Sequence, residues 1–257
     1  MVKGLNRFRD YFADHKDCYV LIGGAALWLV LDDAGLEPRV TRDLDIVLSI
    51  EALDSQFAAL FWQFVNEGGY QIKEKSSGGR IFYRFSHPSE KDYPEMLELF
   101  SRAPDQLALG DDSHLTPIPV AEDVSSLSAI LLDEDYYQFL HANVTELDGV
   151  SIIDERCLIP FKAKAWLDMT ERKAVGGRVD SKDIKKHRND VLSLYQILEP
   201  DSSITLPDSI AGDLTAFLER GEPEIDGNVL KERGIKGVTS DELLARVGAV
   251  FGLSTTA

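Results

Sequence analysis

The chain has 257 residues, of which 44% are hydrophobic and 28% charged, and its net charge at pH 7 is −17. These values predict an ordinary globular protein with a substantial core, built as one large domain or two modest ones. The longest nearly apolar run, Val20 to Leu31, has twelve residues, whereas a membrane-spanning helix needs about 20. The first residues mix charges and lack the apolar stretch of a secretory signal. We therefore expect a cytoplasmic protein without membrane contact.

The cysteines and histidines show no spacing typical of a metal site. Cys18 and Cys157 are far apart, and the five histidines are scattered, which argues against zinc. We expect two buried thiols in a reducing compartment.

The charge is distributed unevenly along the chain. Residues 162–188 contain nine Lys or Arg and four Asp or Glu, a local balance of +5, so the remainder sums to −22. A net charge of −17 disfavours a protein that coats nucleic acid non-specifically. The basic segment indicates a local phosphate site, although a solvated helix face has the same composition.

The first hundred residues alternate between strand and helix patterns, which predicts an α/β domain with a mixed sheet. Short apolar runs indicate buried strands, and apolar residues at helical spacing indicate helices. The expected elements are a helix within 1–16, a strand over 19–22, a helix over 25–31, a strand over 44–48, an amphipathic helix over 51–67, a hairpin with arms 70–75 and 80–86, and a strand over 95–101.

The second half is predicted to be mostly helical. Helices are expected over 125–140, 158–173, about 181–198 and from Thr239 to near Gly252, with a strand or hairpin arm near 149–153. Asp180 or Ser181 is the expected cap of the third helix, and Pro200 ends it. We place the domain boundary near residue 120, with a sheet-containing catalytic domain over 1–120 and a helical domain over 121–257.

The segment from Tyr19 to Leu48 contains the residues that point to chemistry. Gly23-Gly24 follows a predicted strand and precedes a helix, an arrangement that lets the backbone approach a phosphate and aim amide groups at it. A Gly-Gly pair by itself is more often only a tight turn.

Asp43 and Asp45 lie two residues apart on a predicted strand, so both carboxylates leave the same face. Two adjacent carboxylates repel each other unless cations lie between them. Mg²⁺ is typically held by one or two carboxylates plus substrate phosphates, and two such ions stabilise the attacking and leaving oxygens of an in-line displacement. A polar edge face is the alternative, but the order strand, Gly-Gly, helix and paired acids favours a metal site.

A third carboxylate is expected on a neighbouring strand. Glu98 lies among apolar residues, where a pure core strand would not place a charge. The alternative is an edge residue that points outward.

These residues resemble the AbiEii-type nucleotidyltransferases, abortive-infection toxins of the DNA polymerase β superfamily. The resemblance covers roughly residues 15–200 and departs from the family in two respects. Glu98 stands where Asp is commoner, and the gap from Gly24 to Asp43 is longer than in minimal members. The motifs that carry it are Gly23-Gly24, Arg39-x-Thr41, Asp43-Leu-Asp45, Lys162-Ala-Lys-Ala165, and Lys182-Asp183 followed by Asp190.

The resemblance implies a polymerase β-type fold, in which a small mixed sheet flanked by helices precedes a mostly helical half, together with a role for each motif residue. The alternative for each lysine is a solvated helix face. By this resemblance, Gly23 and Gly24 would contact the triphosphate, and Asp43 and Asp45 would bind two Mg²⁺ ions. Glu98 would complete the ligand shell of one ion and help deprotonate the acceptor hydroxyl. Lys162, and more weakly Lys182, would neutralise phosphate charge; Asp190 would be an auxiliary acid or orient Lys162, and Arg42 would brace Asp43 or contact the substrate.

The implied activity is transfer of a nucleoside monophosphate from a nucleoside triphosphate to an acceptor hydroxyl. The resemblance implies the toxin side of a toxin–antitoxin or phage-defence pair, for which a cognate antitoxin is a candidate partner and RNA such as tRNA a candidate acceptor. The acidic chain disfavours an extended RNA track, so a small-molecule acceptor, as in antibiotic-modifying relatives, remains an alternative, and a protein hydroxyl is a third. A degenerate member that binds nucleotide or a partner without catalysis is the alternative from another class.

Overall fold

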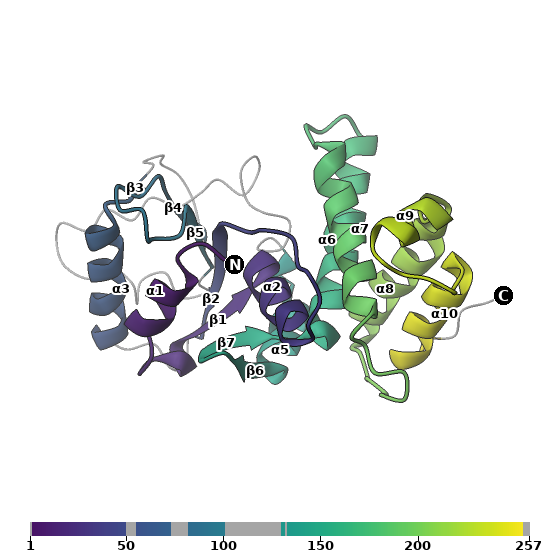
Figure 1. Ribbon diagram of the computed structural model, residues 1–257, viewed down its shortest axis with the longest axis horizontal. Helices are drawn as coiled ribbons and strands as arrows, with labels where there is room; N and C mark the ends of the chain where they lie inside the picture. The colour runs from purple at the N-terminus through teal and green to yellow at the C-terminus, as the bar shows by residue number, and fades with distance from the viewer. Residues whose placement is uncertain (1, 50–54, 73–81, 101–129, 132, 254–257) are drawn as a thin grey trace. The chain divides into compact units, whose positions relative to one another are not determined.

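The computed structural model describes residues 2–49, 55–72, 82–100, 130–131 and 133–253. These residues form two compact units, and each is described by itself (Figure 1). The sheet unit takes residues up to 100 together with 144–153, and the helical unit takes 130–143 and the residues from 154 onward. Over the described residues, no helix combines the length and the apolar composition that crossing a membrane requires.

The sheet unit contains a seven-stranded mixed sheet in the order β3-β4-β5-β2-β1-β7-β6. β2 runs parallel to β5, and β1 runs parallel to β7, while the other neighbours are antiparallel. The predicted α/β architecture with a mixed sheet is confirmed. The strands are β1 (Tyr19–Ile22), β2 (Asp43–Leu48), β3 (Gln71–Ile72), β4 (Phe82–Ser86), β5 (Met96–Phe100), β6 (Val144–Leu147) and β7 (Val150–Ile153).

Helices α1 (Leu5–Tyr11) and α3 (Ser55–Gly68) pack on one face of this sheet through an aromatic cluster. The ring of Phe8 lies 5.0 Å from that of Tyr19 on β1, and the ring of Phe61 lies 5.7 Å from that of Phe85 on β4. Tyr19 is paired with Leu48 on β2, so the same face carries Leu44, Ile46 and Leu48, which are all buried. This aromatic face is one part of the core of the sheet unit; the opposite face carries polar side chains of β2 and β5 next to the buried apolar residues Val20, Ile22, Val47 and Phe100.

Helix α2 (Gly23–Asp33) begins directly at the end of β1. The two glycines were expected to separate the strand from the helix, but they are the first two residues of the helix itself. Gly23 has φ +67°, a backbone conformation that glycine adopts without steric cost, and this allows the strand to turn into the helix without an intervening loop.

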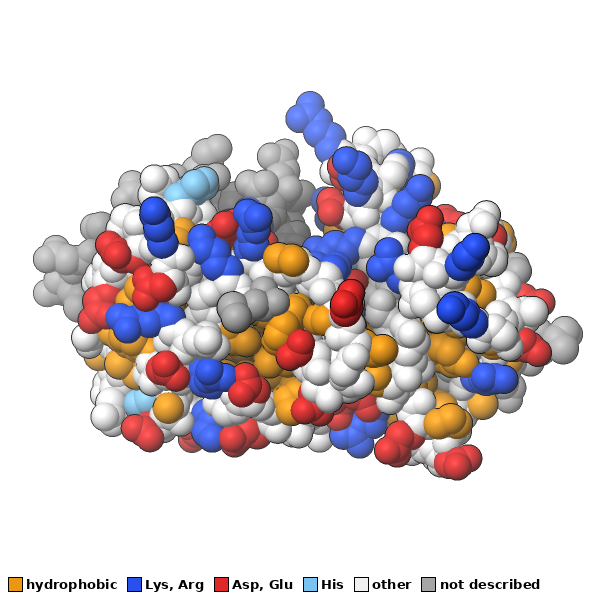
Figure 2. All heavy atoms as spheres, viewed as in Figure 1, with side chains coloured by type: hydrophobic (Ala, Val, Ile, Leu, Met, Phe, Trp, Pro, Cys, Tyr) orange, Lys and Arg blue, Asp and Glu red, His pale blue; other side chains and the backbone are white. Residues whose placement is uncertain are grey.

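The helical unit contains helices and no strand among its described residues. Asp180 caps α7 by accepting a hydrogen bond from the Lys182 amide at 2.9 Å, and Thr239 and Glu242 form a capping box at the start of α10; both predicted starts are confirmed. On the face shown in Figure 2, Lys and Arg side chains gather over the upper end of α6 and α7. The helices are α5 (Glu134–Ala142), α6 (Glu155–Ala174), α7 (Ser181–Tyr195), α8 (Asp208–Gly221), α9 (Gly227–Glu232) and α10 (Ser240–Val250), with the short 3₁₀ helix η4 (Glu222–Glu224).

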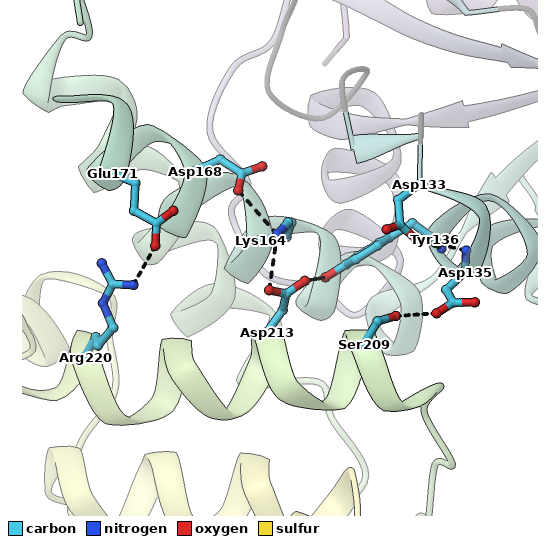
Figure 3. A network of polar contacts seen from close by, with 9 residues as sticks. All are labelled: Asp133, Asp135, Tyr136, Lys164, Asp168, Glu171, Ser209, Asp213 and Arg220. Carbon is cyan, nitrogen blue, oxygen red and sulfur yellow. Dashed lines mark hydrogen bonds and ion pairs between the residues drawn. The ribbon is translucent and has the colours of Figure 1, made fainter. Parts of the chain in front are cut away.

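A polar network joins α5, α6 and α8 within the helical unit (Figure 3). Its centre is Lys164, whose Nζ lies 3.1 Å from Asp213 Oδ1 and 3.4 Å from Asp168 Oδ1. The Tyr136 hydroxyl donates to Asp213 Oδ2 at 3.1 Å. One lysine on α6 therefore bridges its own helix to α8, and Asp213 extends the contact to α5.

The boundary between the units differs from a single cut near residue 120, a position that lies outside the described residues. The hairpin formed by β6 and β7 belongs to the sheet unit, because β7 pairs with β1 at Leu21 and Ile152. All four residues of β7 are buried, and the strand has neighbours on both edges, β1 and β6. The helix expected over 125–140 is described only in part, as α5.

Candidate active site

The strand register places the three predicted acids on one face of the sheet. Asp45 is opposite Glu98 in the parallel pairing of β2 and β5, and Asp43 is opposite Met96. Residues in register on neighbouring strands project to the same side, and residues two apart on one strand do so as well. Asp43, Asp45 and Glu98 therefore share the face opposite the aromatic face, which we call the acidic face.

The two aspartates combine a rigid backbone with access to solvent. Leu44 and Ile46 anchor β2 in the core, while Asp43 and Asp45 between them are partly exposed. Carboxylates held in this way on a buried strand have little freedom to separate. The arrangement suits a ligand that two carboxylate oxygens can share, such as a divalent cation.

Gly23 lies against the carboxylate of Asp45. A methyl group on Gly23 would overlap the Asp45 carboxylate, with its Cγ only 2.9 Å away. The N-cap residue Ile22 provides no side-chain hydrogen bond to the first amides of α2. A helix N-terminus favours anionic groups, and the Asp45 carboxylate lies beside the start of α2.

Gly24 is equally close to the Arg39-x-Thr41 segment. A Cβ atom on Gly24 would lie 2.7 Å from the Thr41 hydroxyl oxygen and 3.6 Å from Arg39 Nη2. Thr41 is buried. The sequence motif is therefore a packing unit, in which Gly23 makes room for Asp45 of β2 and Gly24 makes room for Thr41 of the segment that leads into β2.

Glu98 differs from the two aspartates in its burial and in its partner. It is 5% exposed, and its Oε1 accepts a hydrogen bond from Arg84 Nε at 2.9 Å and a second, shorter one from Arg84 Nη2. Arg84 lies opposite Glu98 on β4. The sequence analysis did not identify Arg84, because its role depends on the register between β4 and β5.

The donor set fits Mg²⁺ at the two aspartates but not at Glu98 as it is positioned here. Within the described ranges, no three His, Cys, Asp or Glu side chains are grouped closely enough to hold a metal ion. The Glu98 carboxylate faces a guanidinium instead. Asp43 and Asp45 are the residues that would hold a divalent cation, and Glu98 would join them only after its ion pair with Arg84 had opened.

Among the described residues, the side chain of Arg42 pairs with Glu95 and not with Asp43. Its Nη1 lies 3.2 Å from Glu95 Oε1, and its side chain is 63% exposed. Lys3 Nζ approaches the same Glu95 oxygen at 3.3 Å. These cations lower the pKa of Glu95, Lys3 through a hydrogen bond and Arg42 through its charge. Arg42 thus belongs to an exposed ion-pair cluster beside the strand.

Lys162 and Asp190 form a buried ion pair within the helical unit. Lys162 on α6 and Asp190 on α7 are joined by an Nζ–Oδ2 distance of 2.9 Å, and their side chains are 1% and 4% exposed. The alternative of a solvated helix face is therefore wrong for Lys162. Asp190 is thus an ion-pair partner of Lys162, whereas Lys182, at the second position of α7, is exposed.

Comparison with known proteins finds similarity to a solved structure. No protein-family model matches the chain, and no curated protein matches it. The chain is similar to the crystal structure of an antigenic nucleotidyltransferase-like protein from Paracoccidioides brasiliensis, with 17% identity over 98% of this chain and 99% of that one, and a TM-score of 0.43. A TM-score of this size assigns no family, so any function has to be inferred from the residues of the site.

Proposed function

We propose that the chain is a nucleotidyltransferase that moves a nucleoside monophosphate from a nucleoside triphosphate to an acceptor hydroxyl, with two Mg²⁺ ions. The observation that carries the proposal is the acidic face, where Asp43 and Asp45 leave β2 side by side and the start of α2 lies against Asp45. Two carboxylates beside a helix N-terminus can bring together a cation and an anionic phosphate. The same residues carry the sequence resemblance to AbiEii-type enzymes.

In this proposal Asp43 and Asp45 hold the ions, which would supply charge stabilisation for the attacking and leaving oxygens. Gly23 and Gly24 allow the triphosphate to approach the backbone of α2. Glu98 would add a third carboxylate to the metal ligands if its ion pair with Arg84 opened. Lys162, oriented by Asp190, is proposed to neutralise phosphate charge, and Lys182 is a secondary candidate for the same role.

The biological setting proposed by resemblance is a cytoplasmic toxin of a toxin–antitoxin or phage-defence pair that acts on RNA. The net charge of −17 favours a small-molecule acceptor as the second candidate, since an extended basic track is what polyanion binding requires. The Arg84–Glu98 pair favours a third candidate, a member that binds nucleotide without transferring it.

The test is transfer of label from each of the four α-³²P nucleoside triphosphates, with Mg²⁺, to total RNA, to a panel of small hydroxyl compounds and to the protein itself. The Asp45→Asn variant should lose at least about a thousandfold of the activity, because removing a charge-stabilising group commonly costs 10²–10³ and loss of a metal costs more. Asp32→Asn, an exposed acid at the end of α2 with the same charge change, should retain full activity.

The destination of the label decides among the acceptors. Nucleotide binding without transfer to any acceptor would support the non-catalytic candidate. Equal activity of the Asp45→Asn and native proteins would contradict the proposal.

A further inference from the structure

One face of α7 lines a pocket in the helical unit, far along the sequence from the acidic face. Ser181, Ile184, Lys185 and Arg188 follow the spacing i, i+3, i+4 and i+7, which places them on one side of the helix. Thr170 and Lys173 of α6 and Glu224 of η4 complete the lining. The pocket has a volume of about 370 Å³, within the roughly 300–1,000 Å³ of small-molecule sites.

The pocket is cationic in an acidic chain. Lys173, Lys185 and Arg188 line it against one carboxylate, that of Glu224. Arg188 Nη1 lies 3.1 Å from Glu224 Oε2 and donates to the Glu224 backbone carbonyl at 2.7 Å. Since this one carboxylate is already paired, two lysines remain as uncompensated positive charge within the pocket.

Arg188 is held in place before any ligand arrives. It is only 5% exposed, and its Nε and Nη2 lie 3.3 and 3.1 Å from Asn189 Oδ1. A guanidinium fixed by several contacts loses little conformational freedom on binding an oxyanion. Lys173 is also positioned, because its Nζ contacts the Ser181 hydroxyl across the pocket.

Lys185 is the cation most available to a ligand. It is exposed, and no hydrogen bond or ion pair to it occurs among the described residues. The Thr170 hydroxyl donates to the Trp166 carbonyl at 2.7 Å, so the nitrogen groups are the main donors into the pocket. No aromatic side chain is among its lining residues, which leaves no ring on which a base could stack.

We propose that this pocket binds the phosphate group of a small ligand, either inorganic phosphate or a phosphate monoester. Lys173 and Lys185 provide N–H donors, and Arg188 adds positive charge to the lining, the combination that recognises a phosphate dianion. The inference does not depend on the proposed transferase activity. Binding is expected without divalent cation and without either aspartate of the acidic face.

The test follows backbone amide shifts of the ¹⁵N-labelled full chain in EDTA, during titration with inorganic phosphate or ribose 5-phosphate at constant ionic strength. Saturable shifts centred on residues 170–188 are expected for the native protein. Lys185→Met should weaken binding at least about fivefold, because one charge-assisted hydrogen bond is lost. The matched control Lys186→Met removes an adjacent exposed charge outside the pocket and should change affinity by less than about twofold.

Glu224→Gln keeps the backbone carbonyl that Arg188 uses but removes the one negative charge. It should tighten binding about two- to threefold if the pocket binds an anion, since a repulsive charge is removed. Tighter binding of ribose 5-phosphate assigns an ester as ligand, and equal affinities assign the phosphate group alone; both support the proposal. Equal losses in Lys185→Met and Lys186→Met, or no saturable shift in the native protein, would overturn it.

Discussion

Gly23 shows how a single missing methyl group shapes the site. Its φ of +67° and its contact with the Asp45 carboxylate are two separate reasons for glycine at this position. Gly35, at the end of the same helical segment, shares the first reason but not the second: its φ is +73°, and nothing lies within 4 Å of a Cβ added there. The two positions therefore form a natural pair for separating backbone strain from crowding of the acid.

We predict that Gly23→Ala destabilises the protein more than Gly35→Ala, by about 1–3 kcal/mol, because overpacking is added to a backbone strain that both variants share. It should also abolish the stabilisation by Mg²⁺ and nucleotide, which we expect to be about 2.7 kcal/mol in the native protein at a hundredfold excess over Kd. Thermal melts with EDTA and with Mg²⁺–nucleotide measure both effects. Equal behaviour of the two variants would mean that Gly23 does not shape the Asp45 site.

Arg84 is the residue of the acidic face that most affects what Glu98 can do. Removing it by Arg84→Met would leave a carboxylate that is 5% exposed without its guanidinium, a loss worth about 3–5 kcal/mol for a buried pair. Mg²⁺ should then stabilise this variant more than it stabilises the native protein, since the cation can replace the lost charge. Urea unfolding with and without Mg²⁺ measures the difference.

Two controls define the Arg84 result. Arg84→Met combined with Glu98→Gln should recover most of the lost stability, because the double variant has no unpaired charge at position 98. Arg42→Met, which breaks an exposed ion pair, should cost less than about 1 kcal/mol. A Mg²⁺ effect that is the same in Arg84→Met and native protein would exclude Glu98 as a metal ligand.

At the scale of elements, the network around Lys164 joins three helices with unequal contributions from its two acids. Interaction with Asp168 and Asp213 raises the pKa of Lys164 in spite of its desolvation. Burial raises the pKa of Asp168, and its attraction to Lys164 only partly offsets that effect. Asp213 also accepts from Tyr136. Asp213 thus contacts both Lys164 and Tyr136, whereas burial destabilises the ionised form of Asp168.

We predict that Asp168→Asn leaves stability at pH 7 unchanged or higher, whereas Asp213→Asn lowers it by about 1 kcal/mol, because a charge-assisted contact is weakened. A raised folded-state pKa means that the folded protein binds the proton more tightly, so the cost of ionised Asp168 disappears as the pH falls towards the unfolded value of about 3.9. Any advantage of Asp168→Asn should therefore shrink from pH 7 to pH 4. Urea unfolding across this range provides the measurement, and an advantage that grows as the pH falls would contradict it.

The sequence predicted local features of these elements better than contacts between them. Strand parity at Asp43 and Asp45 and the cap at Asp180 follow from spacings of a few residues. The burial of Lys162 does not, because a lysine is exposed in most proteins and a contact distant in sequence, the pairing with Asp190, helps to make its burial tolerable. The contact of Arg84 with Glu98 likewise depends on how β4 pairs with β5, which no local pattern specifies.

At the scale of the whole molecule, the α/β class and the helical second part were predictable from the periodicity of apolar residues. The order of the strands was not. β5 lies beside β2 and β7 lies beside β1 in parallel pairs, and each pair joins segments separated by long stretches of chain. A parallel pair requires a long connection, and its length leaves no signature in the sequence of either strand. The hairpin of β6 and β7 was therefore assigned to the second domain by its position in the chain.

That hairpin also determines when the sheet can form during synthesis. The chain passes from the sheet unit into the helical unit with residues 130–143, returns with residues 144–153, and leaves again at residue 154. The edge of β1 that receives β7 stays unpaired until residue 153 has left the ribosome, and pairings of such high sequence separation form slowly. A chain truncated at residue 120 would present that apolar edge permanently, so aggregation rather than an independent catalytic domain is the expected result of such a truncation.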